Sequence, residues 1–485
     1  MRAVDAIYTI INFPDYQNNP LIEALPPKVS DEKVTRILEN FPDHQEEDRS
    51  LESLDRVEYL SRLKQLTQVM PVYIDVFRMI ERVIKEGYST KHPLSPTTQH
   101  YLTYSYDEIP DVLPSSGSFE PKGTAITMLG DSGVGKSRLL HRCLGFFPQV
   151  IKHKEYKGDS LDIVQVTWLY VQCSHDSNLR GFCHEILDSL DEVLGTTTTP
   201  KSTISTLLKQ IEQKLKSNFV GVLVIDEVQA LKIGKSGGKD NLLGFLLNLI
   251  NKCGIPIVFS GNLEAKQTMQ HVFRVARRAE SGGYVEMERL PYDTMWTFFA
   301  EELWVLQWTN KKTDFDEALS RELHHLSTGV FDVACRIYRQ AQLMVIGSGD
   351  ERITNEVLEN AYKASCKLTH DDLSIYRRIR RADNKQECVA YDLESGSSAF
   401  SKKPKKLENP DPKKKIITGD LTRPQHPEFS EQLMELKNCV DLFDRIVDPD
   451  LLRRSLDEDN QKQFLINKEV LCSDPLSFFE AMDSK

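Results

Sequence analysis

Residues Gly130-Asp-Ser-Gly-Val-Gly-Lys136-Ser137 match the complete GxxxxGK[ST] pattern of a phosphate-binding loop. The preceding run Thr124-Ala-Ile-Thr-Met-Leu129 is typical of a strand, and a helical pattern begins at Ser137. A glycine-rich loop between a strand and a helix is the context that this pattern requires. Its backbone N–H groups and the positive end of the helix can then surround a phosphate. The sequence therefore predicts a nucleotide site at this loop.

The loop residues have distinct expected roles. We expect Lys136 to reach the β- and γ-phosphates and the Ser137 hydroxyl to bind magnesium. A glycine-rich turn that matches the pattern by chance is the alternative, but the strand and helix on either side favour a phosphate loop. The expected nucleotide contacts are Gly130, Asp131, Ser132, Gly133, Val134, Gly135, Lys136 and Ser137.

A second motif is acidic. The run Gly-Val-Leu-Val-Ile is followed directly by Asp226 and Glu227. A buried strand that carries two carboxylates at its C-terminal end is a Walker B motif. We expect Asp226 to hold magnesium through water and Glu227 to polarise the attacking water. A plain helix cap is the alternative for an isolated Asp-Glu pair, but the phosphate loop favours catalysis.

Two further features downstream suit ATP hydrolysis. Asn262 lies two residues after the strand-like run Ile255–Ser260 and is our candidate for a sensor of the γ-phosphate. A simple turn is the alternative, because Gly-Asn suits one. Arg277 or Arg278, in a cluster that also contains Arg274, is our candidate for an arginine finger that reaches a neighbouring subunit. A solvated charged face is the alternative for the cluster.

Basic segments offer possible contacts to nucleic acid. Lys232, Lys235 and Lys239 lie in a glycine-rich basic stretch, so we predict that they bind DNA phosphates. A merely solvated loop is nearly as good an interpretation. Arginines at 377–381 and lysines at 402–415 form two more basic patches, which suit nucleic acid or an acidic protein partner.

The chain divides into four expected zones. Residues 1–105 form an N-terminal extension, 106–290 an α/β nucleotide-binding domain, 291–384 a helical lid, and 385–485 a linker with a C-terminal partner-binding tail. In the second zone, strand-like and helical runs alternate, which indicates a parallel sheet covered by helices. Ser, Pro and Lys predominate over residues 395–427, which suggests partial disorder.

Three local expectations concern element boundaries. Leucines and Val57 recur at three-residue steps from Leu51 to Leu66 and predict one amphipathic helix. A second helix is expected from Pro71 to Lys85, with Gly87 just beyond its end. The apolar run Val164–Val171 predicts a single strand of the parallel sheet.

Composition narrows the class of protein. The 485 residues carry 61 Lys and Arg against 72 Asp and Glu, a net charge of −11, which disfavours a protein covered in basic charge but permits a local basic surface. The nine cysteines include no CxxC pair, so we expect reduced, packed thiols in a cytoplasmic protein. We also expect neither a signal peptide nor a membrane span.

Taken together, these motifs resemble an AAA+ ATPase: a phosphate loop, a Walker B pair, a polar sensor strand, an arginine cluster and a helical lid. The upstream segment Asn19-Pro-Leu-Ile-Glu-Ala-Leu-Pro-Pro27 is more particular. It resembles the N-terminal signature of the TnsC/TniB regulators of Tn-seven-type transposons, including the CRISPR-associated ones. The resemblance covers about residues 12–370.

The resemblance implies a P-loop AAA+ sheet flanked by helices, with ATP and magnesium as cofactors. It also implies a bacterial cytoplasmic protein that forms homo-oligomeric rings or helical filaments on double-stranded DNA. Such a protein couples a target selector (TniQ- or TnsD-like) to transposase subunits (TnsA- or TnsB-like), and hydrolysis drives disassembly. By position, Asn262 becomes the first sensor and Arg277 or Arg278 the finger in trans.

One departure and two alternatives remain at this point. Many AAA+ lids carry an arginine shortly after the Ser-Thr-Gly turn, whereas here the corresponding residue is Asp332 and the next arginine is Arg336. The arginine expected for a second sensor is therefore missing from its usual position. The alternatives are another AAA+ ATPase of the initiator or clamp-loader type, and an NTPase switch that binds only proteins.

Overall fold

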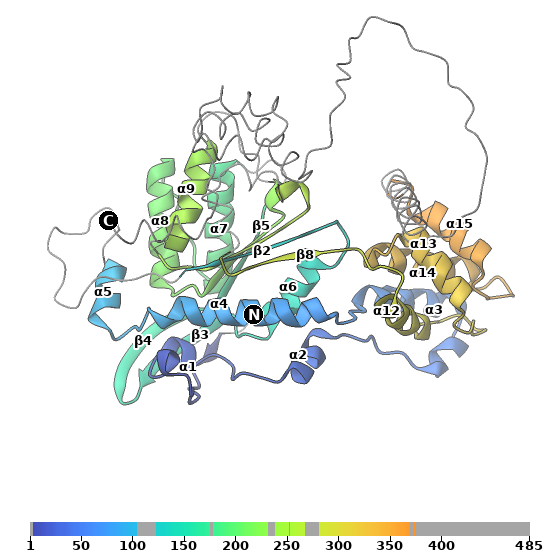
Figure 1. The fold of residues 1–485 in the computed structure, drawn as a ribbon, viewed down its shortest axis with the longest axis horizontal. Helices are drawn as coiled ribbons and strands as arrows, with labels where there is room; N and C mark the ends of the chain where they lie inside the picture. The colour runs from blue at the N-terminus through green and yellow to red at the C-terminus, as the bar shows by residue number, and fades with distance from the viewer. Residues whose placement is uncertain are drawn as a thin grey trace, which may run out of the picture. The chain divides into compact units, whose positions relative to one another are not determined.

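Five parallel strands form the central sheet of the computed structural model, in the order β5-β6-β7-β2-β8 (Figure 1). The structure describes residues 3–103, 123–174, 178–230, 238–251, 253–266, 281–368 and 373. The strands are β2 (Ala125–Gly130), β5 (Trp168–Gln172), β6 (Val222–Asp226), β7 (Ile257–Gly261) and β8 (Gly283–Met287). The strand that leads into the phosphate loop, β2, thus lies between β7 and β8.

Helices cover both faces of this sheet (Figure 1). On β6, Leu223 and Ile225 pack in one apolar core with one group of helices, whereas Val222 and Val224 pack in a second core with the other group. Because both faces are covered, every residue of the strand is buried. The first group is α7 (Leu179–Leu194), α8 (Ile204–Ser217) and α9 (Gly238–Asn251); the second is α4 (Pro71–Ser89) and α6 (Lys136–Gly145). The predicted fold class, a P-loop AAA+ sheet flanked by helices, is confirmed.

A smaller sheet joins the N-terminus to this domain. Strand β1 (Val4–Asp5) runs parallel to β3 (Val150–Tyr156), which pairs antiparallel with β4 (Asp159–Val166). The N-terminal part of the chain also contains short helices: η1 (Pro14–Tyr16), α1 (Pro20–Glu23), α2 (Asp31–Leu38) and α5 (Pro96–Thr103).

The segment Asn19–Pro27 is a buried anchor in this region. Asn19 caps α1 by accepting a hydrogen bond from Leu21 N at 3.0 Å, and its amide donates to Tyr88 O at 2.8 Å. Leu21 and Ile22 are fully buried. The residues that carry the TnsC/TniB resemblance therefore fix α1 against α4, and their role in this fold is structural.

In the described part of the lid, the helices are α12 (Thr294–Val305), α13 (Glu317–Ser327), α14 (Phe331–Val345) and α15 (Asn355–Ser365). Residues 45–68, which we call the strap, pack against it and contain η2 (Glu46–Ser50), α3 (Ser53–Tyr59) and η3 (Leu60–Gln65). Arg56 of the strap pairs with Glu351 through two hydrogen bonds of 2.5 and 2.9 Å. The N-terminal extension therefore contacts both the α/β domain and the lid.

The predicted single helix over Leu51–Leu66 is wrong. The chain forms α3, tightens into η3 at Leu60, and then leaves helical geometry at Leu66. Leu60, Leu63 and Leu66 share the lid core, whereas Leu54 remains 80% exposed. The three-residue spacing of the leucines suits the three-residue turn of a 3₁₀-helix.

The predicted end of the next helix at Lys85 is also wrong, because α4 continues to Ser89. Tyr88 explains the extension: its side chain is fully buried, and its hydroxyl donates to Phe219 O at 2.8 Å. Packing against the domain therefore holds the last turn in helical geometry despite Gly87.

The single strand predicted over Val164–Val171 is in fact two strands of different sheets. The chain leaves β4 at Val166, passes Thr167, and enters the parallel sheet as β5. Thr167 N donates to Gln149 O, and Thr167 O accepts from Val222 N, so this residue contacts both neighbouring segments. The apolar run is continuous because both strands are buried at this junction.

Other expectations lie outside the described residues, including the linker and tail at 385–485. Within the described residues, no helix is long and apolar enough to cross a membrane.

Candidate active site

The phosphate loop connects the C-terminal end of β2 to the start of α6. Gly133 and Gly135 have positive φ angles of 85° and 101°, a conformation that strains any residue with a Cβ. Gly135 is the N-cap of α6, so the first N–H groups of the helix receive no side-chain cap. This arrangement fits a phosphate, which can accept hydrogen bonds from those N–H groups.

Lys136 folds back over its own loop. Its Nζ donates to Gly130 O at 2.8 Å and to Asp131 O at 2.9 Å, and the residue is 8% exposed. Burial lowers the pKa of Lys136, and the nearby carboxylates of Glu227 and Asp226 oppose that effect without cancelling it. A phosphate in the loop would supply the negative charge that this buried ammonium group lacks.

Ser137 and Asp226, predicted separately as magnesium ligands, are in direct contact. Ser137 Oγ donates to Asp226 Oδ2 at 2.6 Å, and Glu227 N donates to Oδ1 at 2.9 Å. Burial raises the pKa of Asp226, but these bonds outweigh burial and the pKa lies below its ordinary value. An ionised carboxylate beside a hydroxyl supplies the oxygen ligands that Mg²⁺ prefers.

Magnesium here would depend on few protein ligands. Among the described residues, no group of three or more His, Cys, Asp or Glu side chains is placed to hold a metal ion. Mg²⁺ usually binds one or two protein oxygens together with water and substrate phosphates, which agrees with the pair Ser137 and Asp226.

Tyr170 is a site residue that the sequence analysis missed. It lies on β5, beside β6, and its hydroxyl donates to Asp226 Oδ2 at 2.5 Å. Burial, together with this bond, raises the pKa of Tyr170, so the phenol remains a donor at neutral pH. No sequence motif includes this tyrosine. Its contact with Asp226 follows from the strand order, which places β5 beside β6.

Glu227 follows β6 in a left-handed conformation with φ of +57°. Such a conformation in a residue with a Cβ costs of the order of 1–2 kcal/mol, and strain of this kind concentrates at functional sites. Its side chain lines a cavity together with Lys136 and Ser137. Lys136, Ser137, Asp226 and Glu227, four of the predicted site residues, thus lie at one end of the sheet.

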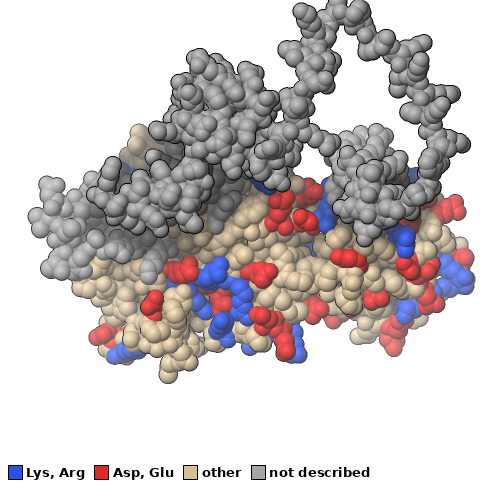
Figure 2. Space-filling model, viewed as in Figure 1, with Lys and Arg blue, Asp and Glu red and all other residues tan. Residues whose placement is uncertain are grey.

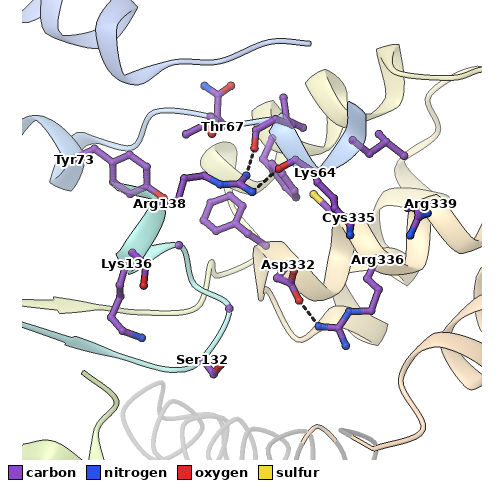
Figure 3. Close-up of a pocket in the computed structure, with 18 of the residues that line it drawn as sticks. Lys64, Thr67, Tyr73, Ser132, Lys136, Arg138, Asp332, Cys335, Arg336 and Arg339 are labelled. Carbon is purple, nitrogen blue, oxygen red and sulfur yellow. Dashed lines mark hydrogen bonds and ion pairs between the residues drawn. The ribbon is translucent and has the colours of Figure 1, made fainter. Parts of the chain in front are cut away.

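The cavity has a volume of about 650 Å³ and two walls (Figure 3). The phosphate loop, the start of α6 and Glu227 form the first. The second is formed by Leu63, Lys64 and residues 66–68 of the strap, by Tyr73 and by the lid. The lid residues are Phe299, Phe331, Asp332, Cys335, Arg336 and Arg339.

Arg138 connects the phosphate loop to the strap. It follows Ser137 directly, and its guanidinium donates to Leu66 O at 2.8 Å and to Lys64 O (Figure 3). The residue that holds the strap against the cavity is therefore adjacent in sequence to the expected magnesium ligand. The sequence analysis did not single out Arg138, because its partners are backbone carbonyls of the strap, which no sequence pattern identifies.

The lid touches the phosphate loop through backbone and charge. Asp332 N donates to Gly133 O at 3.2 Å. Arg289, which follows β8, donates to Asp131 Oδ2 at 2.5 Å and to Thr328 Oγ1 at 2.8 Å. The loop and the lid are thus linked next to the phosphate site.

Asp332, which stands where many AAA+ lids carry an arginine, forms an ion pair. Asp332 pairs with Arg336, one helical turn further along α14, and both line the cavity (Figure 3). An arginine therefore faces the cavity from this helix, although not at the position where many AAA+ lids place one.

Asn262 makes local contacts at the end of β7. Its Oδ1 accepts from Ala265 N at 3.3 Å, and its amide donates to Glu264 Oε2 at 3.2 Å. These are the contacts of a turn, so a sensor role stays a prediction. Arg277, Arg278, Lys232 and Lys235 lie outside the described residues, and the structure places Lys239 in α9 without describing its side chain.

Comparisons with known proteins agree with this fold. Residues 122–269 match the protein family described as AAA domain. This range runs from the start of β2 to the turn after β7, so it includes the phosphate loop, Asp226, Glu227 and Asn262. This part of the chain is therefore similar to an AAA domain and has the P-loop AAA+ fold. A comparison with curated proteins found no match.

Solved structures with a similar fold are distant in sequence. The ORC2 protein of Aeropyrum pernix is 14% identical with a TM-score of 0.36, over 50% of this chain and 62% of that one. Cdc6p of Pyrobaculum aerophilum is 14% identical with a TM-score of 0.39, over 55% and 71%. Domain III of the Thermotoga maritima replication initiation protein DnaA is 17% identical with a TM-score of 0.33, over 61% and 93%. The chain thus spans less than two thirds of the ORC2 structure.

Proposed function

We propose that this chain is a magnesium-dependent ATPase that uses nucleotide binding to control its assembly on double-stranded DNA. The observation that carries the ATPase proposal is the convergence of Lys136, Ser137 and Glu227 on one cavity, with Asp226 hydrogen-bonded to Ser137. Phosphoryl transfer needs positioning and charge stabilisation more than covalent chemistry, and these residue types supply both.

In the proposed mechanism, Lys136 leaves the carbonyls of its own loop and binds the β- and γ-phosphates. Ser137 and Asp226 would hold magnesium, which neutralises phosphate charge during transfer. Glu227 orients the attacking water and accepts its proton as the bond to ADP breaks, which gives ADP and inorganic phosphate. Asn262 senses the γ-phosphate, and Arg277 or Arg278 acts from a neighbouring subunit.

The specific biological role in the proposal is regulation of DNA transposition. Support comes from the resemblance of Asn19–Pro27 to the TnsC/TniB signature, a segment that the fold uses as an anchor for α1. In that role a homo-oligomer on DNA couples a target selector to transposase subunits, in the bacterial cytoplasm. The domain boundaries at 105, 290 and 384 belong to the same proposal.

Contacts to DNA are assigned in the proposal to Lys232, Lys235 and Lys239. On the face shown in Figure 2, Lys and Arg are interspersed with Asp and Glu over the described residues. Because the net charge is −11, binding to phosphates requires a local basic surface and should weaken steeply with salt.

The test is fluorescence anisotropy of a labelled DNA duplex with the full chain, in ADP, in a slowly hydrolysed ATP analogue, and without nucleotide. We expect cooperative, salt-sensitive binding only with the analogue. Glu227→Gln should remain on DNA in ATP itself, whereas the surface control Glu155→Gln should behave as the wild type.

The other outcomes distinguish the alternatives. Absence of DNA binding in all three conditions would overturn the DNA role and leave a switch that binds only proteins. DNA binding without capture of a purified transposase subunit would instead point to another AAA+ ATPase, such as an initiator-like one.

A further inference from the structure

Gln229 lies between two parts of the active site that are distant in sequence. It belongs to η5 (Val228–Ala230), the turn that follows β6 and Glu227. Its Nε2 donates to Glu227 Oε2, and its Oε1 accepts a hydrogen bond from Asn262 N at 3.0 Å. One side chain thus joins the expected catalytic carboxylate to the first residue after β7.

The orientation of the Gln229 amide follows from its partners. The backbone N–H of Asn262 can only donate, so the amide oxygen must face β7. The NH₂ group then faces the Glu227 carboxylate, which can only accept when ionised. A glutamine meets both demands, whereas a glutamate in its place would lack the donor.

The surrounding fold leaves room for this side chain and little freedom to move. A Cβ on Gly261 would lie 2.7 Å from Gln229 Oε1, so a larger residue at the end of β7 would displace the amide. Val228 and Ala230, on either side of Gln229, are buried. Ala230 N donates to Glu227 O at 2.8 Å, which closes the turn around the left-handed Glu227.

We propose that Gln229 is a positioning residue for Glu227, an inference that rests on the proposed ATPase function. It fixes one carboxylate oxygen by a hydrogen bond and leaves the other for the attacking water. Because its second bond goes to Asn262 N, displacement of the residues after β7 moves the amide and, through it, the carboxylate. The end of β7 thereby controls whether Glu227 is aligned for hydrolysis.

The experiment measures kcat and KM for ATP hydrolysis, and the Kd of a fluorescent ATP analogue, for the wild type and Gln229→Met. Methionine keeps the approximate shape and removes both hydrogen bonds. We expect kcat to fall about tenfold, because a general base contributes roughly 10²–10⁴-fold and misalignment loses part of that. The Kd should change less than about twofold, since this carboxylate acts in the chemical step and not in ground-state binding.

Two further variants separate positioning from a structural role. In a Glu227→Gln background, Gln229→Met should have no additional effect on the residual rate, because the group that it aligns is gone. Gln229→Glu keeps the length of the side chain but lacks the donor to Glu227, so kcat should fall as it does in Gln229→Met. The surface variant Gln213→Met on α8 is the matched control and should match the wild type.

The inference and the proposed function fail in different ways. If the wild type hydrolyses ATP and Gln229→Met does so at the same kcat, the positioning role is wrong and the ATPase assignment stands. A rise in the Kd in parallel with the loss of rate, or an equal effect in the Glu227→Gln background, would also overturn it. If the wild type itself shows no turnover, the proposed function fails, and the role of Gln229 fails with it.

Discussion

One wall of the cavity comes mainly from a single stretch of sequence within residues 132–138, whereas the opposite wall joins the end of the strap to α12 and α14 of the lid. The first wall consists of backbone N–H groups, Lys136 and Ser137, whose chemistry is written in a motif. The second is held by Arg138, Arg289 and the strap–lid pair of Arg56 with Glu351. The comparison suggests that local sequence fixes the phosphate side of the site, while long-range contacts fix the other side.

The largest expected effect breaks the second wall. Arg56 and Glu351 are 4% and 7% exposed and form a bidentate pair. Arg56→Met would leave a buried carboxylate without its partner, which costs about 3–5 kcal/mol. Urea unfolding of the full chain measures the loss, and Arg56→Met combined with Glu351→Leu should recover part of it. A loss below about 1 kcal/mol would show that the strap does not depend on this pair.

The next effect breaks the first wall. Lys136→Ala removes the charged contact to the phosphates, at a cost of about 3 kcal/mol, and should weaken ATP binding about 100-fold. Stability should change little by comparison, because the Nζ bonds only to carbonyls of its own loop. Titration of a fluorescent ATP analogue measures the change, and Lys209→Ala on α8 is the control. Normal affinity in Lys136→Ala would contradict the site assignment.

A smaller effect is expected from a long-range contact that supports the expected magnesium ligand Asp226. Tyr170 supports Asp226 from the neighbouring strand, and loss of such support to a metal ligand typically costs about 10–100-fold in metal affinity. Tyr170→Phe should therefore require about tenfold more Mg²⁺ for half-maximal ATP hydrolysis. Tyr284→Phe also removes a hydroxyl bond to a carboxylate, that of Glu286, and serves as the control. Equal Mg²⁺ requirements in both variants would refute the role of Tyr170.

The smallest expected effect concerns how the stability conferred by the strap changes at acid pH. Hydrogen bonds from Arg56 hold the pKa of Glu351 at about 2, below its ordinary value of 4.5. This carboxylate therefore stabilises the fold above pH 4.5, and its contribution disappears as the pH falls from about 4.5 to 2. Urea midpoints between pH 7 and 3 should fall less steeply for Glu351→Gln than for the wild type. Parallel slopes would show that this pair does not set the acid sensitivity.

The sequence predicts the parts of the site that depend on local patterns. The phosphate loop, Asp226 and Glu227 could be assigned because strand, loop and helix are consecutive in the chain. Tyr170 could not, since its contact with Asp226 requires β5 to lie beside β6. The strap could not be predicted either, because the leucines that suggest one helix fall in different segments, and of them Leu60, Leu63 and Leu66 pack in the lid core.

The same contrast explains the fold. Strand β6 is apolar up to its last residue, Asp226, and was predicted within two residues, because both of its faces are covered by helices. The hairpin of β3 and β4 was missed, since Lys152, Lys154 and Glu155 interrupt its apolar pattern and point to solvent. Half-exposed strands at the margin of a domain carry a weaker periodic signal than buried central ones.

The most direct test of the account is phosphate release from ATP by the purified full chain, with and without magnesium, beside Glu227→Gln. We expect magnesium-dependent turnover by the wild type, and ATP binding of similar affinity but turnover reduced at least about 100-fold in the variant. Absence of both binding and turnover in the wild type, or unchanged turnover in Glu227→Gln, would contradict the assignment of this cavity as an ATPase site.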